Sequence, residues 1–180
     1  NNQVYYGINT GFGSLCNELI SNSDLKKLQV NLVKSHACGA GKEIDLPIIK
    51  LMLLLKVNAL SMGFSGVTLN TIEKLIFLFN NDILPAVYES GSLGASGDLA
   101  PLAHLCLPLI GEGMVNFKNN KVSAKDVFNS FSEDILELES KEGLALLNGT
   151  QFMTAHAIHA FLKLESLFNW ADKIAALSLD

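Results

Sequence analysis

Three short segments of the chain combine glycine with polar residues: residues 4–14, residues 90–98 and the Asn148-Gly149 pair. Glycine weakens the interior of helices and strands but permits tight loop conformations, so we expect these segments to be loops. The sequence between them carries apolar residues at intervals of three and four, which is typical of helices that bury one face or more. The chain is therefore expected to be mainly α-helical, with three loops of unusual composition.

Capping residues and apolar spacing place the first expected helices. They should cover approximately residues 24–38, 47–63 and 70–84, because Asp, Pro and Asn start such segments and glycine or proline stops them. In the third helix, Glu73 is expected to complete a capping box with Asn70.

The second half of the chain is interpreted by the same rules. Asp98 is expected to cap a helix that carries Pro101 in its first turn and is kinked at Pro108. Alternating residues over 114–123 predict a small β-hairpin around an Asn119-Asn120 turn. The remaining expected elements are helical: residues 124–131, and a tail from Lys141 onward that is interrupted at Asn148-Gly149.

The composition fits a folded chain and limits its partners. Hydrophobic residues make up 49% and charged residues only 17%, unlike a disordered segment. The net charge is −5 and no basic run is present, so no nucleic-acid partner is expected. The longest apolar stretch, Leu99–Ile110, contains His104 and two prolines and is shorter than the ~20 residues of a membrane-spanning helix, so no membrane is expected either.

The cysteines suggest the redox environment of the chain, and its first residue suggests its relation to a longer protein. Cys16, Cys38 and Cys106 are scattered and form no Cys-x-x-Cys pair, which suits a reducing cytoplasm. The sequence starts at Asn1 instead of Met, and we expect it to be a part of a longer protein.

The segment from Gly91 to His104 carries the most chemical information. It reads Gly-Ser-Leu-Gly-Ala-Ser-Gly-Asp-Leu-Ala-Pro-Leu-Ala-His. One interpretation is a flexible turn before a helix, and a second is a phosphate-binding loop at a helix N-terminus. Against phosphate, no Gly-Lys-Ser/Thr follows, and Asp98 would place a carboxylate where the anion binds.

In a third interpretation, the tripeptide Ala95-Ser96-Gly97 modifies itself. The Gly97 nitrogen attacks the Ala95 carbonyl carbon and closes a five-membered ring, an approach that only glycine permits without a clash of Cβ. Ring closure releases one water and Ser96 loses a second, which leaves a methylidene conjugated to an imidazolone. The product is an electrophile, which no ordinary side chain supplies.

This segment resembles the signature of the aromatic amino acid ammonia-lyases, in which Ala-Ser-Gly cyclises to 4-methylidene-imidazol-5-one. Three further segments are similar to motifs of that family and follow in its order: Tyr6–Gly13, Gly63–Val67 and Lys141–Gln151. The resemblance implies the helical N-terminal part of an ammonia-lyase-like fold of the fumarase/aspartase-like superfamily. Residues 1–180 would then be a single active-site-bearing portion of a longer chain, without its N-terminus and its C-terminal helical bundle.

The resemblance also implies roles for individual residues. Tyr6 matches the family's catalytic tyrosine, which removes the β-proton of the substrate, and Asn148 matches the asparagine that contacts the substrate carboxylate. Ser35-His36 matches members that act on histidine, where the imidazole of His36 would bind the substrate ring, whereas members that act on phenylalanine or tyrosine tend to carry Phe-Leu or His-Leu. The structural alternatives are a loop-anchoring tyrosine, a core histidine and an Asn-Gly turn.

The implied activity is that of a carbon-nitrogen lyase that eliminates ammonia from L-histidine to give trans-urocanate, a step of histidine degradation. Ala95, Ser96 and Gly97 would form the catalytic group, and the family's homotetramers share active sites between subunits. Three alternatives stay open: a phenylalanine or tyrosine ammonia-lyase, a 2,3-aminomutase that uses the same electrophile, and a non-catalytic helical assembly domain.

The remaining polar residues indicate no second kind of chemistry. His156 and His159 lie three apart on a helix, but no third ligand stands at a supporting spacing, so no metal is expected. His104 is expected to pack behind the electrophile. Lys56 and Thr68 depart from the family pattern, because many relatives carry arginine at these two positions.

Overall fold

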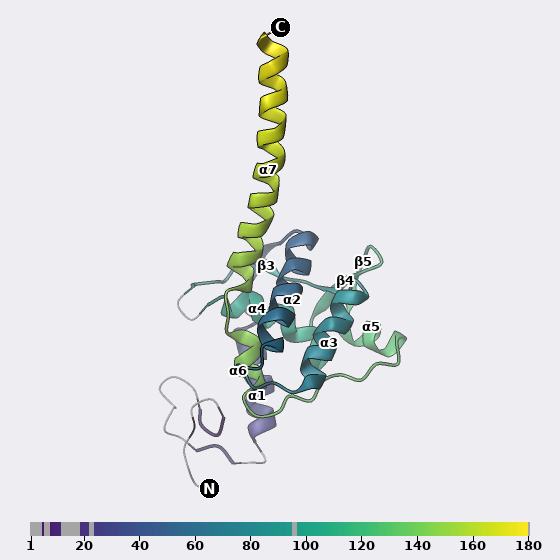
Figure 1. Cartoon of the computed structure of the whole chain (residues 1–180). Coiled ribbons are helices and arrows are strands. Elements are labelled where there is room, and N and C mark those ends of the chain that lie inside the picture. The colour runs from purple at the N-terminus through teal and green to yellow at the C-terminus, as the bar shows by residue number, and fades with distance from the viewer. Residues whose placement is uncertain (1–4, 6–7, 12–18, 22–23, 95–96, 180) are drawn as a thin grey trace.

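The computed structural model describes residues 5, 8–11, 19–21, 24–94 and 97–179 of the chain. Helices make up most of this part, so the expected mainly α class is confirmed. In chain order, and as labelled in Figure 1, they are α1 (Leu25–His36), α2 (Leu46–Ser61), α3 (Leu69–Asn80), α4 (Leu99–Cys106), the 3₁₀ helix η2 (Leu107–Ile110), α5 (Ala124–Ser130), α6 (Glu142–Leu147) and α7 (Gln151–Leu179).

Short antiparallel strands form two small sheets within the described ranges. β1 (Ala40–Glu43) pairs with β3 (Tyr88–Ser90), and β4 (Met114–Phe117) lies between β2 (Leu84–Pro85) and β5 (Asn120–Ser123). The sequence analysis predicted the hairpin of β4 and β5 but not the other strands, which have two to four residues each and no clear alternation.

The hairpin turn is one residue earlier than predicted. Its central residues are Lys118 and Asn119, both with positive φ (+48° and +63°), whereas Asn120 already belongs to β5. The prediction of an Asn119-Asn120 turn is therefore wrong by one position. A two-residue hairpin turn needs left-handed backbone at both positions, and the register of the β4–β5 pairs decides which two residues adopt it.

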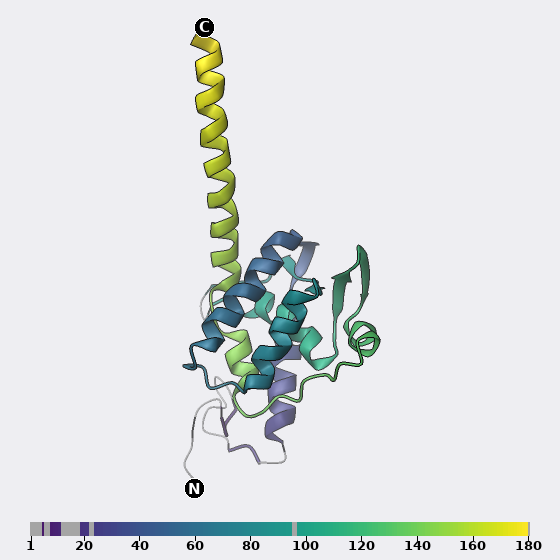
Figure 2. The ribbon, with the colours of Figure 1, turned by 45° about the vertical axis from the view of Figure 1, so that its right-hand side comes forward.

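The apolar core is built around α2. This helix is apolar on nearly all sides, and Ile49, Met52 and Leu53 are completely buried. It packs against α3 and against the first turns of α7, as Figures 1 and 2 show. A helix without a polar face is stable in water only when neighbours cover it, which places α2 at the centre.

Two predicted helix ends need correction. α3 starts at Leu69, and Thr68 caps it by accepting a hydrogen bond from the Thr71 nitrogen (3.4 Å), so the expected capping box of Asn70 and Glu73 is wrong. The kink expected at Pro108 occurs as a change from α to 3₁₀ geometry at Leu107, because proline lacks the N–H of a regular α-helical turn.

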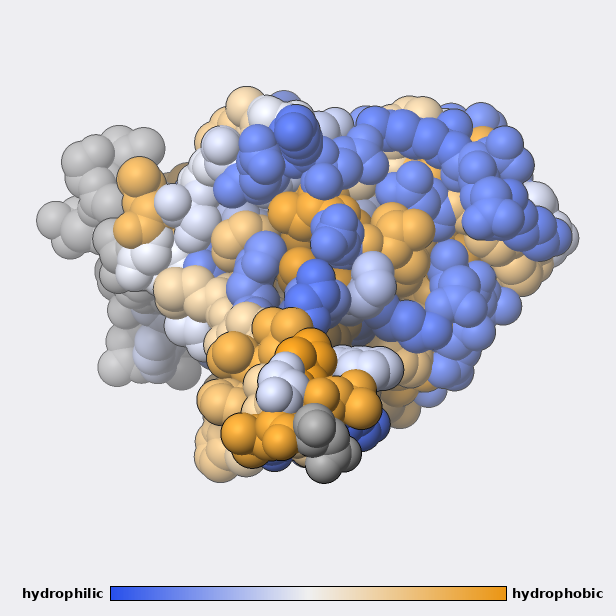
Figure 3. Space-filling view, turned by 90° about the horizontal axis from the view of Figure 1, so that it is seen from above, coloured by the Kyte–Doolittle hydropathy of each residue, from blue (hydrophilic) through white to orange (hydrophobic). Residues whose placement is uncertain are grey.

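The last helix, α7, extends far from the rest of the molecule, as Figures 1 and 2 show. Of its 29 residues only Ala155 is fully buried, although the helix is rich in apolar side chains. Figure 3 shows these side chains gathered along the projecting part. The large exposed ones from residue 161 onward are Phe161, Leu162, Leu164, Leu167, Phe168, Trp170, Ile174, Leu177 and Leu179. None of the helices in the described ranges combines the length and apolar character that a membrane crossing requires.

Candidate active site

A cavity of about 280 Å³ opens where the end of α1 meets the segment that leads into α4. Two of the predicted site residues, His36 and Gly97, line it together. Its volume is close to the lower end of the ~300–1,000 Å³ typical of small-molecule pockets, so a molecule of amino-acid size suits it. The full lining comprises His36, Cys38, Gly91, Leu93, Gly97, Leu99 and Ala100.

His36 is the last residue of α1, and its ring is fixed by the helix itself. The Nδ1 atom lies 2.9 Å from the carbonyl oxygen of Leu32, one turn earlier. A carbonyl can only accept a hydrogen bond, so Nδ1 carries the hydrogen in this contact. In the neutral ring this leaves the lone pair of Nε2 available to a ligand.

Gly97 lies in direct contact with Gly149, although the two are far apart in sequence. The residues form a parallel β-bridge, and the Asp98 nitrogen donates to the Gly149 oxygen at 2.8 Å. A Cβ atom on Gly97 would lie 2.2 Å from that oxygen, and Gly97 has a φ of +92°. Both facts restrict this position to glycine. The Asn148-Gly149 pair is therefore more than a turn, since its glycine contacts the third residue of the tripeptide.

Asp98 joins three segments of the site, and its side chain does not act as predicted. It occupies the N-cap position of α4, but the carboxylate makes no capping bond to that helix. Instead it accepts from the Met153 nitrogen in the first turn of α7 (3.0 Å) and from the hydroxyl of Ser92 (3.0 Å). A first-turn N–H has no partner within its own helix, which is why a neighbouring carboxylate can satisfy it. Asp98 thus ties the loop before α4 to α7.

Asn148 lies beside the site but does not line the cavity. It is the C-cap residue of α6, and its side-chain nitrogen donates to the Leu144 oxygen at 2.8 Å. The side chain is exposed to solvent. The structure therefore brings Asn148 next to the Gly149–Gly97 contact while directing its amide to the end of α6.

Lys56 is the residue that the sequence analysis undervalued. Its side chain is 1% exposed, and its ammonium donates to the carbonyl oxygens of Ala145 (2.9 Å) and Asn148 (2.8 Å). Burial lowers the pKa of Lys56 to about 8. One feature of the sequence could have identified Lys56 as buried: it is flanked on both sides by apolar residues within a helix that is apolar all round.

Thr68, the other departure from the family pattern, contacts a buried carboxylate. Glu142 accepts from the Thr68 nitrogen (2.8 Å) and hydroxyl (2.9 Å) and from the Thr71 hydroxyl (2.6 Å), while its second oxygen accepts from the Glu139 nitrogen (2.8 Å). Burial acts to raise the pKa of Glu142, but these hydrogen bonds together outweigh it and lower the pKa below 4.5.

His104 and Cys106 belong to the core. The Gly39 nitrogen donates to His104 Nε2 at 3.0 Å, and the imidazole ring packs edge-on against Tyr88. Burial lowers the pKa of His104, which keeps the ring neutral and able to accept. Burial also raises the pKa of the Cys106 thiol to about 12, so it is not a nucleophile. The expected packing role of His104 is confirmed.

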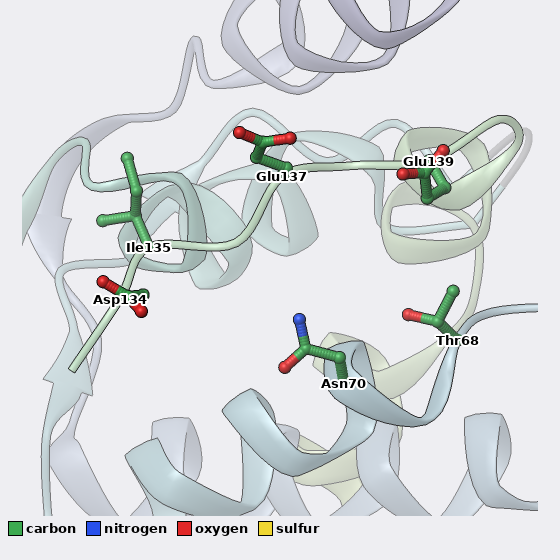
Figure 4. A pocket seen from close by; sticks show the side chains of 6 residues that line it. All are labelled: Thr68, Asn70, Asp134, Ile135, Glu137 and Glu139. Carbon is green, nitrogen blue, oxygen red and sulfur yellow. The ribbon is translucent and has the colours of Figure 1, made fainter.

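A second, larger pocket has a different character. It has a volume of about 600 Å³, and Figure 4 shows Thr68 and Asn70 at the start of α3 facing the loop before α6. Two of its carboxylates, Glu137 and Glu139, pair with Lys26 at the surface. No predicted site residue lines it. In the part of the chain that the structure describes, no group of three or more His, Cys, Asp or Glu side chains is placed to hold a metal ion, and this includes His156 and His159.

Three predicted site residues, Tyr6, Ala95 and Ser96, lie outside the described residues. The structure therefore places Gly97, His36 and Asn148 and leaves the other three as sequence-based expectations.

The sequence and the fold agree with one family of proteins. The whole chain, residues 1–180, matches the aromatic amino acid lyase family, and the chain belongs to this family. It is 53% identical over 178 residues to the histidine ammonia-lyase of Legionella pneumophila (strain Corby), a match that covers 99% of this chain and 35% of that relative.

Solved structures agree on the fold. The phenylalanine aminomutase of Pantoea agglomerans is similar with a TM-score of 0.88 and 31% identity over 94% of this chain. The histidine ammonia-lyase of Trypanosoma cruzi is similar with a TM-score of 0.77 and 41% identity over 85%. The matches cover 32% and 30% of those chains. The chain thus spans about a third of the length of its relatives.

Proposed function

We propose that this chain carries part of the active site of a carbon-nitrogen lyase that eliminates ammonia from L-histidine and yields trans-urocanate. Membership of the aromatic amino acid lyase family supports the reaction class. The similarity to histidine ammonia-lyases supports the substrate. The observation that carries the proposal is the shared cavity, because an imidazole with a free nitrogen, His36, faces it together with Gly97.

The catalytic group is proposed to be 4-methylidene-imidazol-5-one, formed from Ala95, Ser96 and Gly97 with the loss of two waters. The surroundings of Gly97 fit such a group. Its backbone is left-handed and pressed against Gly149 with no room for a Cβ, and the cavity opens beside it. When formed, the group supplies an electrophile that activates the substrate for the loss of its amino group.

The other proposed roles follow from the chemistry of each side chain. Tyr6 removes the β-proton of the substrate, and because free tyrosine has a pKa of ~10, its phenolate needs stabilisation by neighbouring groups. Asn148 donates its amide to the substrate carboxylate, for which its nitrogen has a second N–H besides the one that binds the Leu144 oxygen. His36 binds the substrate ring through Nε2. No metal takes part in the proposed reaction.

The chain is proposed to be the N-terminal active-site-bearing portion of a longer cytoplasmic protein that forms a homotetramer with shared active sites. Two observations support this. The relatives are about three times as long as the chain, and α7 exposes a long row of apolar side chains that a larger assembly would cover.

The experiment is a side-by-side assay of the full-length protein with L-histidine, L-phenylalanine and L-tyrosine, in which ammonia and the organic product are measured. We expect trans-urocanate and ammonia from histidine, and no turnover by the Ser96→Ala variant, in which no methylidene can form. Faster turnover of phenylalanine or tyrosine would show another lyase of the family. A β-amino acid product would show a 2,3-aminomutase; the similar Pantoea structure is that of a phenylalanine aminomutase. Absence of any turnover would favour the non-catalytic assembly domain.

A further inference from the structure

The buried ammonium of Lys56 lies at the end of α6, the helix that is followed directly by Asn148 and Gly149. Lys56 lies on the covered central helix α2, and its ammonium donates to the carbonyls of Ala145 (2.9 Å) and Asn148 (2.8 Å). No carboxylate pairs with it among the residues that the structure describes. The last carbonyls of a helix lack partners in the helix itself, and here a side chain from another helix supplies them.

This contact fixes one particular peptide group. A peptide is planar, so holding the Asn148 oxygen sets the orientation of the whole unit from Asn148 to Gly149. Gly149 then presents its own oxygen to the Asp98 nitrogen and presses on the backbone of Gly97. Lys56 is thereby linked to Gly97 through Gly149, whose nitrogen belongs to the peptide that Lys56 holds and whose oxygen belongs to the next one.

The opposite end of α6 is held as well. The Glu142 carboxylate binds the start of α3 through Thr68 and Thr71, and Gly143 packs closely on the backbone of Gln29 in α1. With its first turn anchored, α6 has little freedom to shift along its axis. The position of the Asn148–Gly149 peptide is therefore set by the Lys56 contact at the free end.

We propose that Lys56 is a positioning residue for the cyclisation of Ala95-Ser96-Gly97: its ammonium holds the Asn148–Gly149 peptide so that Gly149 keeps the Gly97 backbone in its left-handed form. The inference rests on the proposed function. Among the described residues, the Lys56 ammonium binds Ala145 and Asn148 and acts on Gly97 through Gly149. A Gly97 backbone that is already held in one form favours ring closure because less conformational freedom has to be lost before the Gly97 nitrogen attacks.

The test uses the intact mass of the purified full-length protein, since each cyclised chain is lighter by two waters. The Lys56→Met variant keeps the length of the side chain and removes its donors. Lys56→Arg keeps a cation with several donors. Lys50→Met is the matched surface control, because Lys50 lies on the same helix and pairs with Asp82.

A further control separates positioning from stability. Met52→Ala opens the core on the same helix without touching the carbonyls of α6, and its loss of thermal stability is compared with that of Lys56→Met. We expect the wild type, Lys50→Met, Lys56→Arg and Met52→Ala to be fully cyclised. The cyclised fraction of folded Lys56→Met should fall to about a tenth or less, as the loss of pre-organisation predicts.

Two outcomes would overturn the inference: complete cyclisation of folded Lys56→Met, or a loss of cyclisation no greater than that of an equally destabilised Met52→Ala. Should Lys56→Met fail to fold, Lys56→Gln takes its place with the same two criteria, because its side chain is one atom shorter than that of lysine and carries no charge with which to hold the two carbonyls. An uncyclised wild type would instead refute the proposed function itself.

Discussion

At the scale of single residues, the proposed cyclisation depends on the contact between Gly97 and Gly149. Both residues have positive φ, +92° and +141°; a Cβ on Gly97 would meet the backbone of Gly149, whereas a Cβ on Gly149 would meet the end of the Gln151 side chain. Such backbone costs energy for any other residue and persists only where the surroundings hold it. In this structure the Asp98 nitrogen holds the Gly149 oxygen and the Lys56 ammonium holds the Asn148 oxygen.

Replacing Gly97 with alanine should prevent cyclisation. The new Cβ would lie 2.2 Å from the Gly149 oxygen, so the two backbones must separate. We expect the free energy of unfolding to fall by ~1–3 kcal/mol, as at other overpacked sites. The mass of the intact chain should equal that of the unmodified sequence. Gly94→Ala is the control, because a Cβ there meets no atom within 4 Å, although φ is also positive. Full cyclisation of Gly97→Ala would contradict the account.

His36 should decide between substrates. Replacing it with phenylalanine removes the proposed hydrogen bond to the substrate imidazole, and an unpaired polar group in a binding site costs ~1–3 kcal/mol. We expect kcat/KM for histidine to fall about 10- to 100-fold, with a much smaller change for phenylalanine. Cys38→Ala, which alters the same cavity without this hydrogen bond, serves as the comparison. An equal fall in kcat/KM for both amino acids would show that His36 does not recognise the imidazole ring of the substrate.

The sequence identifies some of these residues and not others, for a physical reason. Gly97 and His36 stand in contiguous motifs, so their neighbours in the sequence reveal them. Lys56 is important because it binds the carbonyl of Ala145, which is 89 residues away in the sequence, and no local sequence pattern predicts that contact. The side chain of Asp98 was likewise assigned to its own helix, α4, because the first turn of α7 is a tertiary neighbour only.

At the scale of elements, α6 shows how a short helix is made rigid. It has six residues, too few to be stable alone in water. Its start is bound through the Glu142 carboxylate and its end through the Lys56 ammonium. The Glu142 carboxylate belongs to α6 and binds residues of α3 and of the preceding loop. The Lys56 ammonium belongs to α2 and binds carbonyls at the end of α6, which a short helix leaves unpaired.

The Glu142 contact predicts a pH dependence of stability. Its pKa is below 4.5 in the folded chain, so its contribution is fully present above pH 4.5 and is lost as the pH falls through the lower folded value. The Glu142→Gln variant should be less stable than the wild type by ~1–3 kcal/mol at neutral pH, because its amide faces the Glu139 nitrogen, another donor. The measurement is urea denaturation of the full-length proteins from about pH 6 to about pH 3.5.

The difference between the two proteins should shrink as the solution is acidified. A difference in unfolding free energy that stays constant over this range would show that the Glu142 carboxylate is not ionised in the folded chain. Glu137→Gln is the matched surface control, since Glu137 is exposed and pairs with Lys26. Surface pairs of this kind contribute little, so that variant should follow the wild type.

The helices were predictable because apolar spacing extends over many residues, and all of the expected segments exist within the described ranges. Their ends were less predictable. Thr68 competes with Asn70 as the cap of α3, and the buried Glu142 that stabilises Thr68 is remote in sequence. The strands β1, β2 and β3 exist through pairing with distant segments, so propensity alone does not reveal them.

At the scale of the whole molecule, α7 is the helix whose apolar side chains the described residues leave uncovered. Phe168 is 70% exposed and Leu177 78%, on a helix that leaves the body of the molecule. Exposed apolar rows of this length are typical of interfaces. We expect the full-length protein to be a tetramer by light scattering, and Leu177→Glu to weaken it and to lower activity in parallel.

Glu165→Gln is the comparison for this prediction, because it changes the same helix at a position that is already polar. It should leave both assembly and activity close to those of the wild type. A fully active monomer, or a Leu177→Glu protein with an intact tetramer and full activity, would contradict the proposed assembly.

The central claim is that Ala95, Ser96 and Gly97 become an electrophile, and mass spectrometry of the intact full-length protein tests it most directly. The wild-type chain should be lighter than its sequence by two waters. A wild-type mass equal to that of the unmodified sequence would contradict the account, and with it the proposed elimination of ammonia.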